Sequence, residues 1–82
     1  MKEYDEFIDL IMKMSVDLQK YEITAWIRDI KKELAYTIVF DSEMSIEDFI
    51  SVCNRKMDVL SDKDRSLIVP HLRDMKMRIL GI

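Results

Sequence analysis

Apolar residues recur at helical spacing along the first part of the chain. When residues are placed at 100° per position, eight of them between residues 4 and 21 fall within one broad arc, and charged residues lie opposite. The eight residues are Tyr4, Phe7, Ile8, Leu10, Ile11, Met14, Leu18 and Tyr21. This pattern predicts an amphipathic helix over residues 3–20.

A second apolar stripe predicts a helix over residues 23–38, with Thr24 as a candidate cap. Its members are Ile23, Trp26, Ile27, Ile30, Leu34 and Ile38. The stripe degrades over residues 35–40, where Tyr36, Val39 and Phe40 point away from it. Either this end of the helix is buried on two sides, or it forms an exposed apolar patch.

Two serines mark the starts of two further helices. Ser45 and Ser61 are each followed three residues later by an acid, and a serine side chain at this position accepts a hydrogen bond from the third residue's amide. The third stripe contains Ile46, Phe49, Ile50, Cys53, Met57 and Leu60, and the fourth contains Ile68, Val69, Leu72, Met75 and Ile79. Gly81 is predicted to end the fourth helix.

The sequence predicts an all-α fold in one domain over residues 1–82. The implied connections, about 21–23, 40–44 and 60–61, are short, and short connections favour antiparallel neighbours. Pro70 removes one hydrogen bond from the last helix and crowds the carbonyl of Ser66. We therefore expect a small antiparallel bundle of four helices, with the last helix kinked or broken near Pro70.

Composition excludes several classes of protein. The 82 residues include one Gly, one Pro and one Cys, which excludes a disulfide framework and a glycine-rich phosphate loop. The longest apolar runs have three residues, so no membrane span is predicted. An unpaired Cys53 fits a reducing compartment, and we expect a cytoplasmic protein.

Charge is distributed unevenly around a net value of −3. Residues 41–64 carry seven acids against three bases, whereas residues 65–82 carry one acid against four bases. A nucleic-acid-binding domain normally presents a basic stripe on a basic chain, so nucleic acid is not the expected partner. An acidic middle segment favours a basic partner protein, such as a basic toxin or effector.

Residues capable of catalysis or metal binding do not form a recognisable set. His71 is the only histidine, and helical spacing gives it no nucleophile with an oxyanion hole. One His and one Cys, 18 positions apart, do not supply the ligands of a zinc site, and no calcium loop is present. We predict no catalytic residue, no metal and no cofactor, and we assign Trp26 and Cys53 to the core.

The predicted partner surface combines the off-stripe apolar residues with the acids that follow them. Apolar side chains would hold a partner and acidic side chains would steer its approach. The predicted binding residues are Tyr36, Val39, Phe40, Asp41, Glu43, Glu47 and Asp48. A solvated helix start is the alternative interpretation of the acids.

The layout of the helices resembles that of the small helical immunity proteins of bacterial toxin systems. The resemblance rests on a first amphipathic helix, the segment Tyr21-Glu22-Ile23-Thr24-Ala25-Trp26, the Ser-led helix Ser45-Ile46-Glu47-Asp48-Phe49-Ile50 and a closing helix after Leu60-Ser61. Pro70 and residues 36–40 depart from it. The resemblance implies a cytosolic inhibitor that binds a cognate toxin and has no catalytic residues.

The leading hypothesis is therefore a non-enzymatic protein-binding module that inhibits its partner and acts as a monomer or homodimer. A phage-encoded inhibitor of a host defence system is one alternative. A small oligomerising structural or regulatory protein is another, although no long heptad pattern supports it. A DNA-binding regulator is disfavoured because only the fourth helix is basic, and it contains Pro70.

Overall fold

The prediction of an all-α fold is confirmed by a computed structural model. It describes the backbone of residues 2–39 and 44–82, and the side chains of these residues except 37–39. Within these ranges the chain forms four α-helices and one short 3-10 helix, and no strand. The helices are α1 (Lys2–Asp17), α2 (Tyr21–Val39), α3 (Ile46–Lys56), η1 (Met57–Val59) and α4 (Asp62–Leu80).

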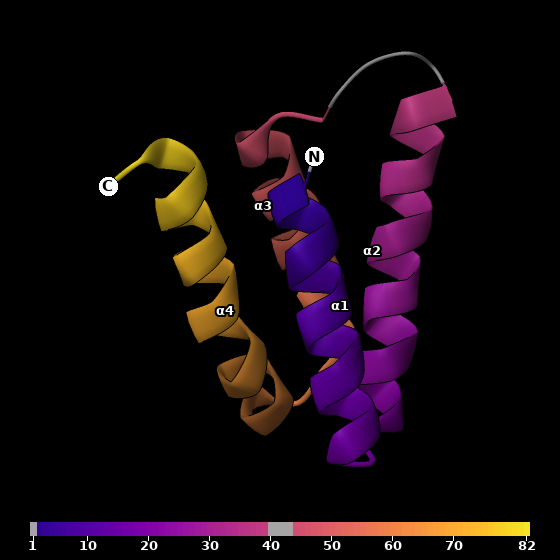
Figure 1. Ribbon diagram of the computed structural model, residues 1–82. Helices are drawn as coiled ribbons and strands as arrows, with labels where there is room; N and C mark the ends of the chain where they lie inside the picture. Colours follow the sequence, from indigo (N-terminus) through magenta and orange to yellow (C-terminus); the bar gives the residue numbers. More distant parts are fainter. Residues whose placement is uncertain (1, 40–43) are drawn as a thin grey trace.

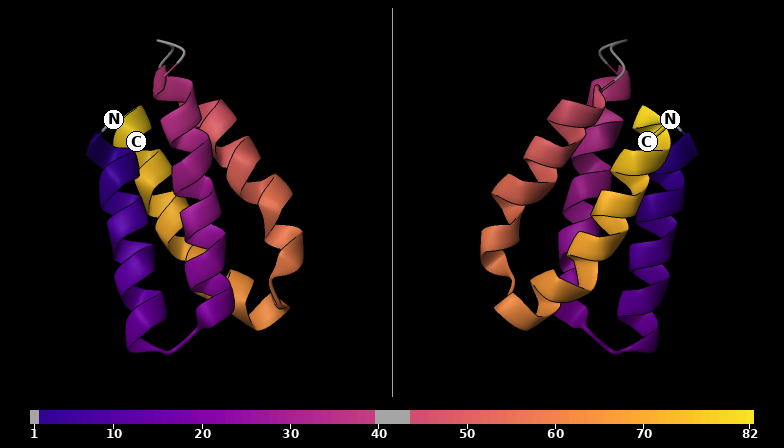
Figure 2. Two further views of the ribbon diagram at one scale, coloured as in Figure 1. Left: turned by 90° about the vertical axis from the view of Figure 1, so that its right-hand side faces the viewer. Right: turned by 90° about the vertical axis from the view of Figure 1, so that its left-hand side faces the viewer.

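Consecutive helices run in alternating directions (Figure 1), as the short connections predict. Helix α1 packs against both α2 and α4, and α3 with η1 packs against α2. Both chain termini lie at the end of the bundle opposite the α1–α2 turn (Figure 2). The first and last helices are therefore neighbours, and the surface between them belongs to both ends of the sequence.

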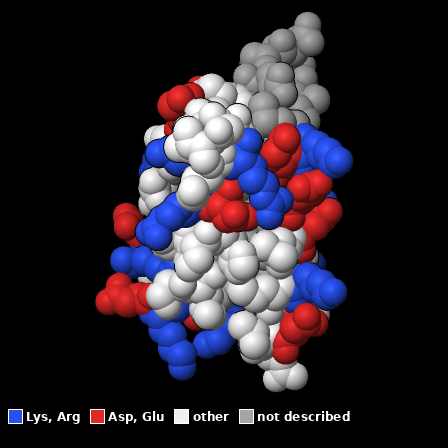
Figure 3. Space-filling model, turned by 60° about the vertical axis from the view of Figure 1, so that its left-hand side comes forward, with Lys and Arg blue, Asp and Glu red and all other residues white. Residues whose placement is uncertain are grey.

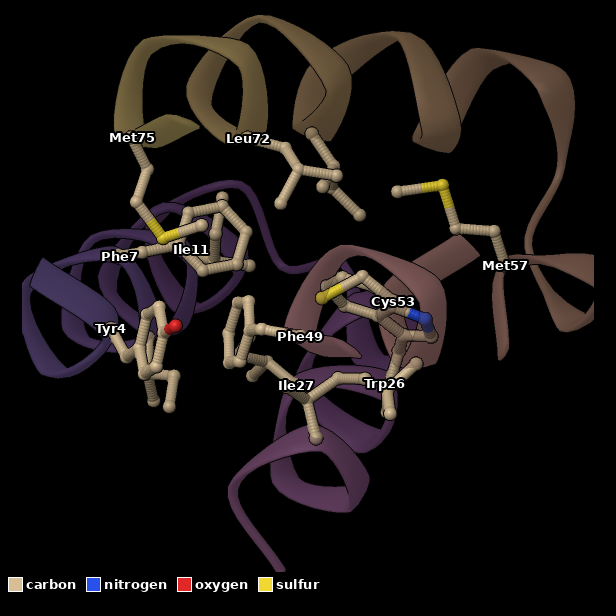
Figure 4. Packing of buried hydrophobic residues seen from close by; sticks show 14 of the residues in the cluster. Tyr4, Phe7, Ile11, Trp26, Ile27, Phe49, Cys53, Met57, Leu72 and Met75 are labelled. Carbon is tan, nitrogen blue, oxygen red and sulfur yellow. The ribbon is translucent and has the colours of Figure 1, made fainter. Parts of the chain in front are cut away.

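The core is one cluster to which every helix contributes (Figure 4). The Phe49 ring of α3 stacks on Tyr4 of α1, with ring centroids 4.4 Å apart and planes inclined by 3°. Phe7 meets the same Phe49 ring edge-on, at 5.9 Å and 83°. Tyr4 also donates a hydrogen bond to the Met44 carbonyl at 2.9 Å. These contacts fix the start of α1 to the start of α3.

Serine caps begin α3 and α4, as the sequence predicts. The Ser45 Oγ accepts a hydrogen bond from the Asp48 amide at 3.1 Å, and the Ser61 Oγ accepts one from the Asp64 amide at 3.2 Å. At the other end of α4, Gly81 adopts a left-handed backbone with φ of 72°. Its conformation lets the amides of Gly81 and Ile82 bond to the Met77 carbonyl, which ends the helix.

The α1–α2 turn closes α1 in the same way but without a glycine. Gln19 has φ of 55°, the Lys20 amide bonds to the Ser15 carbonyl at 2.8 Å, and the Gln19 amide bonds to the Val16 carbonyl at 3.1 Å. This pair of bonds is the Schellman motif, which usually places glycine at the left-handed position. Gln19 therefore holds a strained backbone conformation.

The predicted break of the last helix at Pro70 is wrong. Helix α4 is continuous from residue 62 to residue 80, and the structure does not confirm a kink. The carbonyl that loses its partner belongs to Ser66, and both Ser66 and Pro70 are exposed. Water can therefore replace the missing hydrogen bond, which removes much of the reason for the helix to end.

Thr24 is not a helix cap. It lies one turn inside α2, and its Oγ1 is 2.7 Å from the Oγ of Ser15. Ser15 is buried, and its Oγ lies 2.7 Å from the Met12 carbonyl, while the Thr24 Oγ1 lies 3.3 Å from the Lys20 carbonyl. Each hydroxyl group has one proton and a carbonyl acceptor of its own, so either can be the donor between the two. The contact joins α1 to α2 through a polar pair in an otherwise apolar interface.

Candidate protein-binding groove

A shallow hollow of about 150 Å³ lies where α1 and α4 meet. Phe7 and Met75 form its apolar floor, because both belong to the core cluster. Leu10 and the partly exposed His71 form part of its wall. The remaining lining residues are charged: Glu3, Glu6, Asp74 and Arg78.

A second hollow of about 400 Å³ continues the first along α1, and the two share Leu10. Its other lining residues are Lys13, Met14, Asp17 and Leu18. Leu10 and Leu18 are 47% and 51% exposed, which leaves about half of each side chain available for contact. We refer to the two hollows together as the α1–α4 groove.

The apolar residues of the groove are bordered by charged side chains. Figure 3, which brings the α4 side of the molecule forward, shows an area without Lys, Arg, Asp or Glu below a cluster of charged side chains. Leu10, Met14 and Leu18 follow one another at intervals of four residues, so they form a ridge along α1. An apolar area of this kind is typical of a protein contact site.

Four acidic and two basic residues line the groove, giving it a net charge of −2 with His71 neutral. Arg78 is held by two acids: it donates a hydrogen bond to Asp74 at 2.7 Å, and its guanidinium lies 3.7 Å from Glu6. Glu3 and Asp17, at the two ends of the groove, form no ion pair with any residue in the described part of the chain.

The partner surface predicted from sequence lies elsewhere. Glu47 and Asp48 are exposed in the first turn of α3, and Tyr36 is 63% exposed on α2. Phe40, Asp41 and Glu43 lie outside the described residues, as does the side chain of Val39. The exposure of Tyr36 agrees with the patch interpretation at this one residue.

Tyr36 faces basic as well as acidic neighbours. It lines a hollow of about 220 Å³ together with Asp29, Lys32, Glu33 and Lys56. Lys56 is the last residue of α3, whereas Asp48 stands eight residues earlier, about 12 Å along the helix axis. Neither Glu47 nor Asp48 lines this hollow.

The residues considered for chemistry are separated in the structure. His71 and Asp74 line the groove, but Cys53 is fully buried in the core, where burial raises the pKa of its thiol to about 12. Among the described residues, no group of three or more His, Cys, Asp or Glu side chains is arranged to hold a metal ion. The prediction that Cys53 belongs to the core is confirmed.

Trp26 is also a core residue, as predicted, and is only 2% exposed. Its indole Nε1 has no hydrogen-bond partner among the described residues. A buried donor without a partner loses the hydrogen bond that it would make to water. Trp26 therefore stabilises the fold through its apolar area and not through its polar atom.

No protein-family model, curated protein or solved structure matches this chain. The resemblance to toxin-immunity proteins thus remains a prediction from the layout of the helices. In the part of the chain that the structure describes, none of the helices combines the length and apolar character that crossing a bilayer requires.

Sequence reasoning missed the groove because it assigned Leu10 and Leu18 to the core arc. The broad arc included one flank of α1 that α4 covers only partly. Leu18 keeps the helical spacing, since its amide bonds to the Met14 carbonyl at 2.9 Å, but its side chain lies on this exposed flank. The available signal was the width of the arc, which exceeds what one face of a four-helix core can bury.

Proposed function

We propose that this chain is a non-enzymatic protein-binding module that inhibits a partner protein, in the manner of a toxin-immunity protein. The observation that carries the proposal is the α1–α4 groove, where half-exposed leucines lie between charged rims. The resemblance in helix layout and the acidic net charge support the same class. A cytoplasmic location is part of the proposal and rests on the unpaired Cys53.

Leu10 is the residue whose removal should weaken binding most. It belongs to both hollows, and binding energy concentrates in a few residues near the centre of a contact. In Leu10→Asp a carboxylate would have to lose its water to enter the contact. We expect affinity for the partner to fall at least roughly tenfold, and because Leu10 is half exposed the fold should persist.

The matched control is Val16→Asp. Val16 lies on the same helix, is 61% exposed and lines neither hollow. Both variants introduce one aspartate in place of an exposed aliphatic residue on α1. A loss of binding restricted to Leu10→Asp would therefore assign the effect to the groove rather than to added charge.

The test starts with capture of partners from an extract of the native host, with the wild-type chain, Leu10→Asp and Val16→Asp as parallel baits. The expected partner is retained by the wild type and Val16→Asp and lost by Leu10→Asp. The purified partner's own activity is then measured with increasing amounts of the chain, and inhibition at a one-to-one ratio is expected. Equal capture by all three baits would remove the groove from the proposal, and a bound partner with unchanged activity would contradict inhibition.

A second surface, around Tyr36, Glu47 and Asp48, is part of the proposal as the site of electrostatic steering. Changing Glu47 and Asp48 to Lys should slow association with a basic partner and weaken its salt dependence. Association rates at two salt concentrations provide the measurement. Unchanged rates would leave these acids as a solvated helix start.

The proposal includes no catalytic step for His71. His71→Ala should leave inhibition of the partner stoichiometric, although its place in the groove wall makes a moderate loss of affinity expected. A turnover by the purified chain that disappears in a folded His71→Ala variant would contradict this part of the proposal.

A further inference from the structure

We infer that the α1–α4 groove accepts an amphipathic helix of a partner protein, with apolar residues along one stripe and Lys or Arg near both of its ends. This inference rests on the proposed function, because it specifies the segment that the protein-binding surface recognises. It is drawn from the backbone chemistry of the groove, its length and the position of its charges.

The occupant is a helix because the groove offers no backbone hydrogen bonds. Its lining side chains come from α1, α4 and Leu18, which follows α1. Apart from the end turns and the Ser66 carbonyl, which lines neither hollow, the backbone groups of the two helices are already bonded to one another. An extended segment would bury amide and carbonyl groups without partners, whereas a helix satisfies its own backbone. The ridge of Leu10, Met14 and Leu18 at four-residue intervals also has the geometry that packs between side chains of another helix.

The length of the groove sets the length of the occupant. Glu3 and Asp17 stand at its two ends and are separated by 14 residues of α1, which corresponds to about 21 Å at 1.5 Å per residue. A partner helix of about four turns spans this distance.

The charge of the occupant follows from the acids that are left without partners. Arg78 already pairs with Glu6 and Asp74, about one turn from Glu3, whereas Glu3 and Asp17 form no ion pair with the described residues. Lys13, the other base of the groove, also forms none of these ion pairs, and the groove keeps its net charge of −2. Cations are therefore favoured near both ends of the bound helix, while the middle of the groove offers apolar contact through Leu10 and Met14.

The probes are three synthetic 16-residue peptides. The first is a helix-forming peptide with leucines at i, i+4 and i+8 and lysines near both ends. The second replaces these lysines with glutamates, and the third has the composition of the first in a scrambled order that destroys the stripe. Binding is followed by chemical-shift changes in the amide spectrum of the ¹⁵N-labelled chain.

The expected result is binding of the lysine peptide, with shifts concentrated at Leu10, Met14, Leu18 and His71, and much weaker binding of the other two. Equal binding of the lysine and glutamate peptides, or of the lysine and scrambled peptides, would overturn the inference. Shifts centred on another surface would also overturn it, as would a stable dimer of the chain that occupies the groove in sedimentation experiments.

Two double variants test the charges. Changing Glu3 and Asp17 to Lys should weaken the lysine peptide about tenfold, through two exposed ion pairs. The control changes Asp29 and Asp58 to Lys, which alters the net charge equally at exposed positions outside the groove. Its effect should stay within about twofold at 0.15 M salt, because charges beyond about 8 Å are largely screened. Equal losses in both variants would overturn the inference.

Failure of the inference about a bound helix can be distinguished from failure of the proposed function. A host partner that needs Leu10 for capture but competes with none of the peptides would overturn the helix inference and leave the protein-binding function standing. A partner whose capture is unaffected by Leu10→Asp, combined with specific binding of the lysine peptide in the groove, would contradict the groove's role in the proposed function and leave the preference for a basic helix standing.

Discussion

Replacing the buried Trp26 with Phe should cost far less stability than a core tryptophan usually does. The loss of ring area is roughly 50 Å², which at about 25 cal/mol per Å² amounts to roughly 1 kcal/mol. The same change removes an indole N–H that has no partner among the described residues, and burying such a donor costs about 1–3 kcal/mol. The two terms nearly cancel, so we expect Trp26→Phe to lie within about 1 kcal/mol of the wild type.

Two reference variants provide a scale for the change in stability expected of Trp26→Phe. Trp26→Ala loses the ring altogether and should cost about 3–5 kcal/mol, which is most of the stability expected for a chain of this size. Tyr4→Phe removes a buried polar atom that does have a partner, since the Tyr4 hydroxyl donates to the Met44 carbonyl at 2.9 Å. It should cost about 1–2 kcal/mol, although its ring is retained.

The assay is urea unfolding followed by far-UV circular dichroism, because Trp26 is the only tryptophan and its fluorescence is lost in the variants. With a slope of about 1 kcal/mol per M urea, a change of 1 kcal/mol moves the midpoint by about 1 M. A cost of about 2 kcal/mol or more for Trp26→Phe at an unchanged slope would refute the reasoning. It would mean that the indole N–H has a hydrogen-bond partner in solution.

Three further variants or measurements test local features of the fold. Gln19→Gly should raise the free energy of unfolding by about 0.5 kcal/mol, because relief of the left-handed strain exceeds the added chain entropy; a lower urea midpoint would contradict this. Pro70→Ala should stabilise the protein by about 1–3 kcal/mol, since it restores an amide to an exposed position in a continuous helix, and a thermal melt that moves downward would argue against it. Cys53 should resist thiol reagents in the native state at pH 8 and react on unfolding. Burial raises the pKa of the Cys53 thiol from 9.0 to about 12, so as the pH rises the unfolded chain loses the thiol proton before the folded chain does. The contribution of Cys53 to stability should therefore fall between these two pH values, and this fall should be absent in Cys53→Ala.

Periodicity and caps were sufficient to predict most of the architecture. The serines at 45 and 61 and the glycine at 81 act through hydrogen bonds within a few residues, so their effect can be read locally. Trp26 and Cys53 were assigned to the core from their position on a stripe, and both are buried. These predictions needed no knowledge of how the helices pack.

Features that depend on the neighbouring helix could not be predicted in this way. The burial of Leu10 depends on how closely α4 approaches α1, and the spacing of residues within α1 gives no information about that distance. Val52 was left out of the third stripe yet is buried at 9% exposure. The predicted break at Pro70 failed because a local rule for hydrogen bonding took no account of water at an exposed carbonyl.

The stack of Tyr4 on Phe49 has a consequence for the order of folding events. The Ser15–Thr24 contact spans nine residues across a short turn, whereas Tyr4 and Phe49 are 45 positions apart in the sequence. Closing the longer loop costs more chain entropy, so the α1–α2 hairpin should form early and the aromatic stack late. Loss of the stack in Phe49→Leu should then appear mainly as faster unfolding, and loss of the hydroxyl pair in Ser15→Ala as slower folding, in stopped-flow measurements.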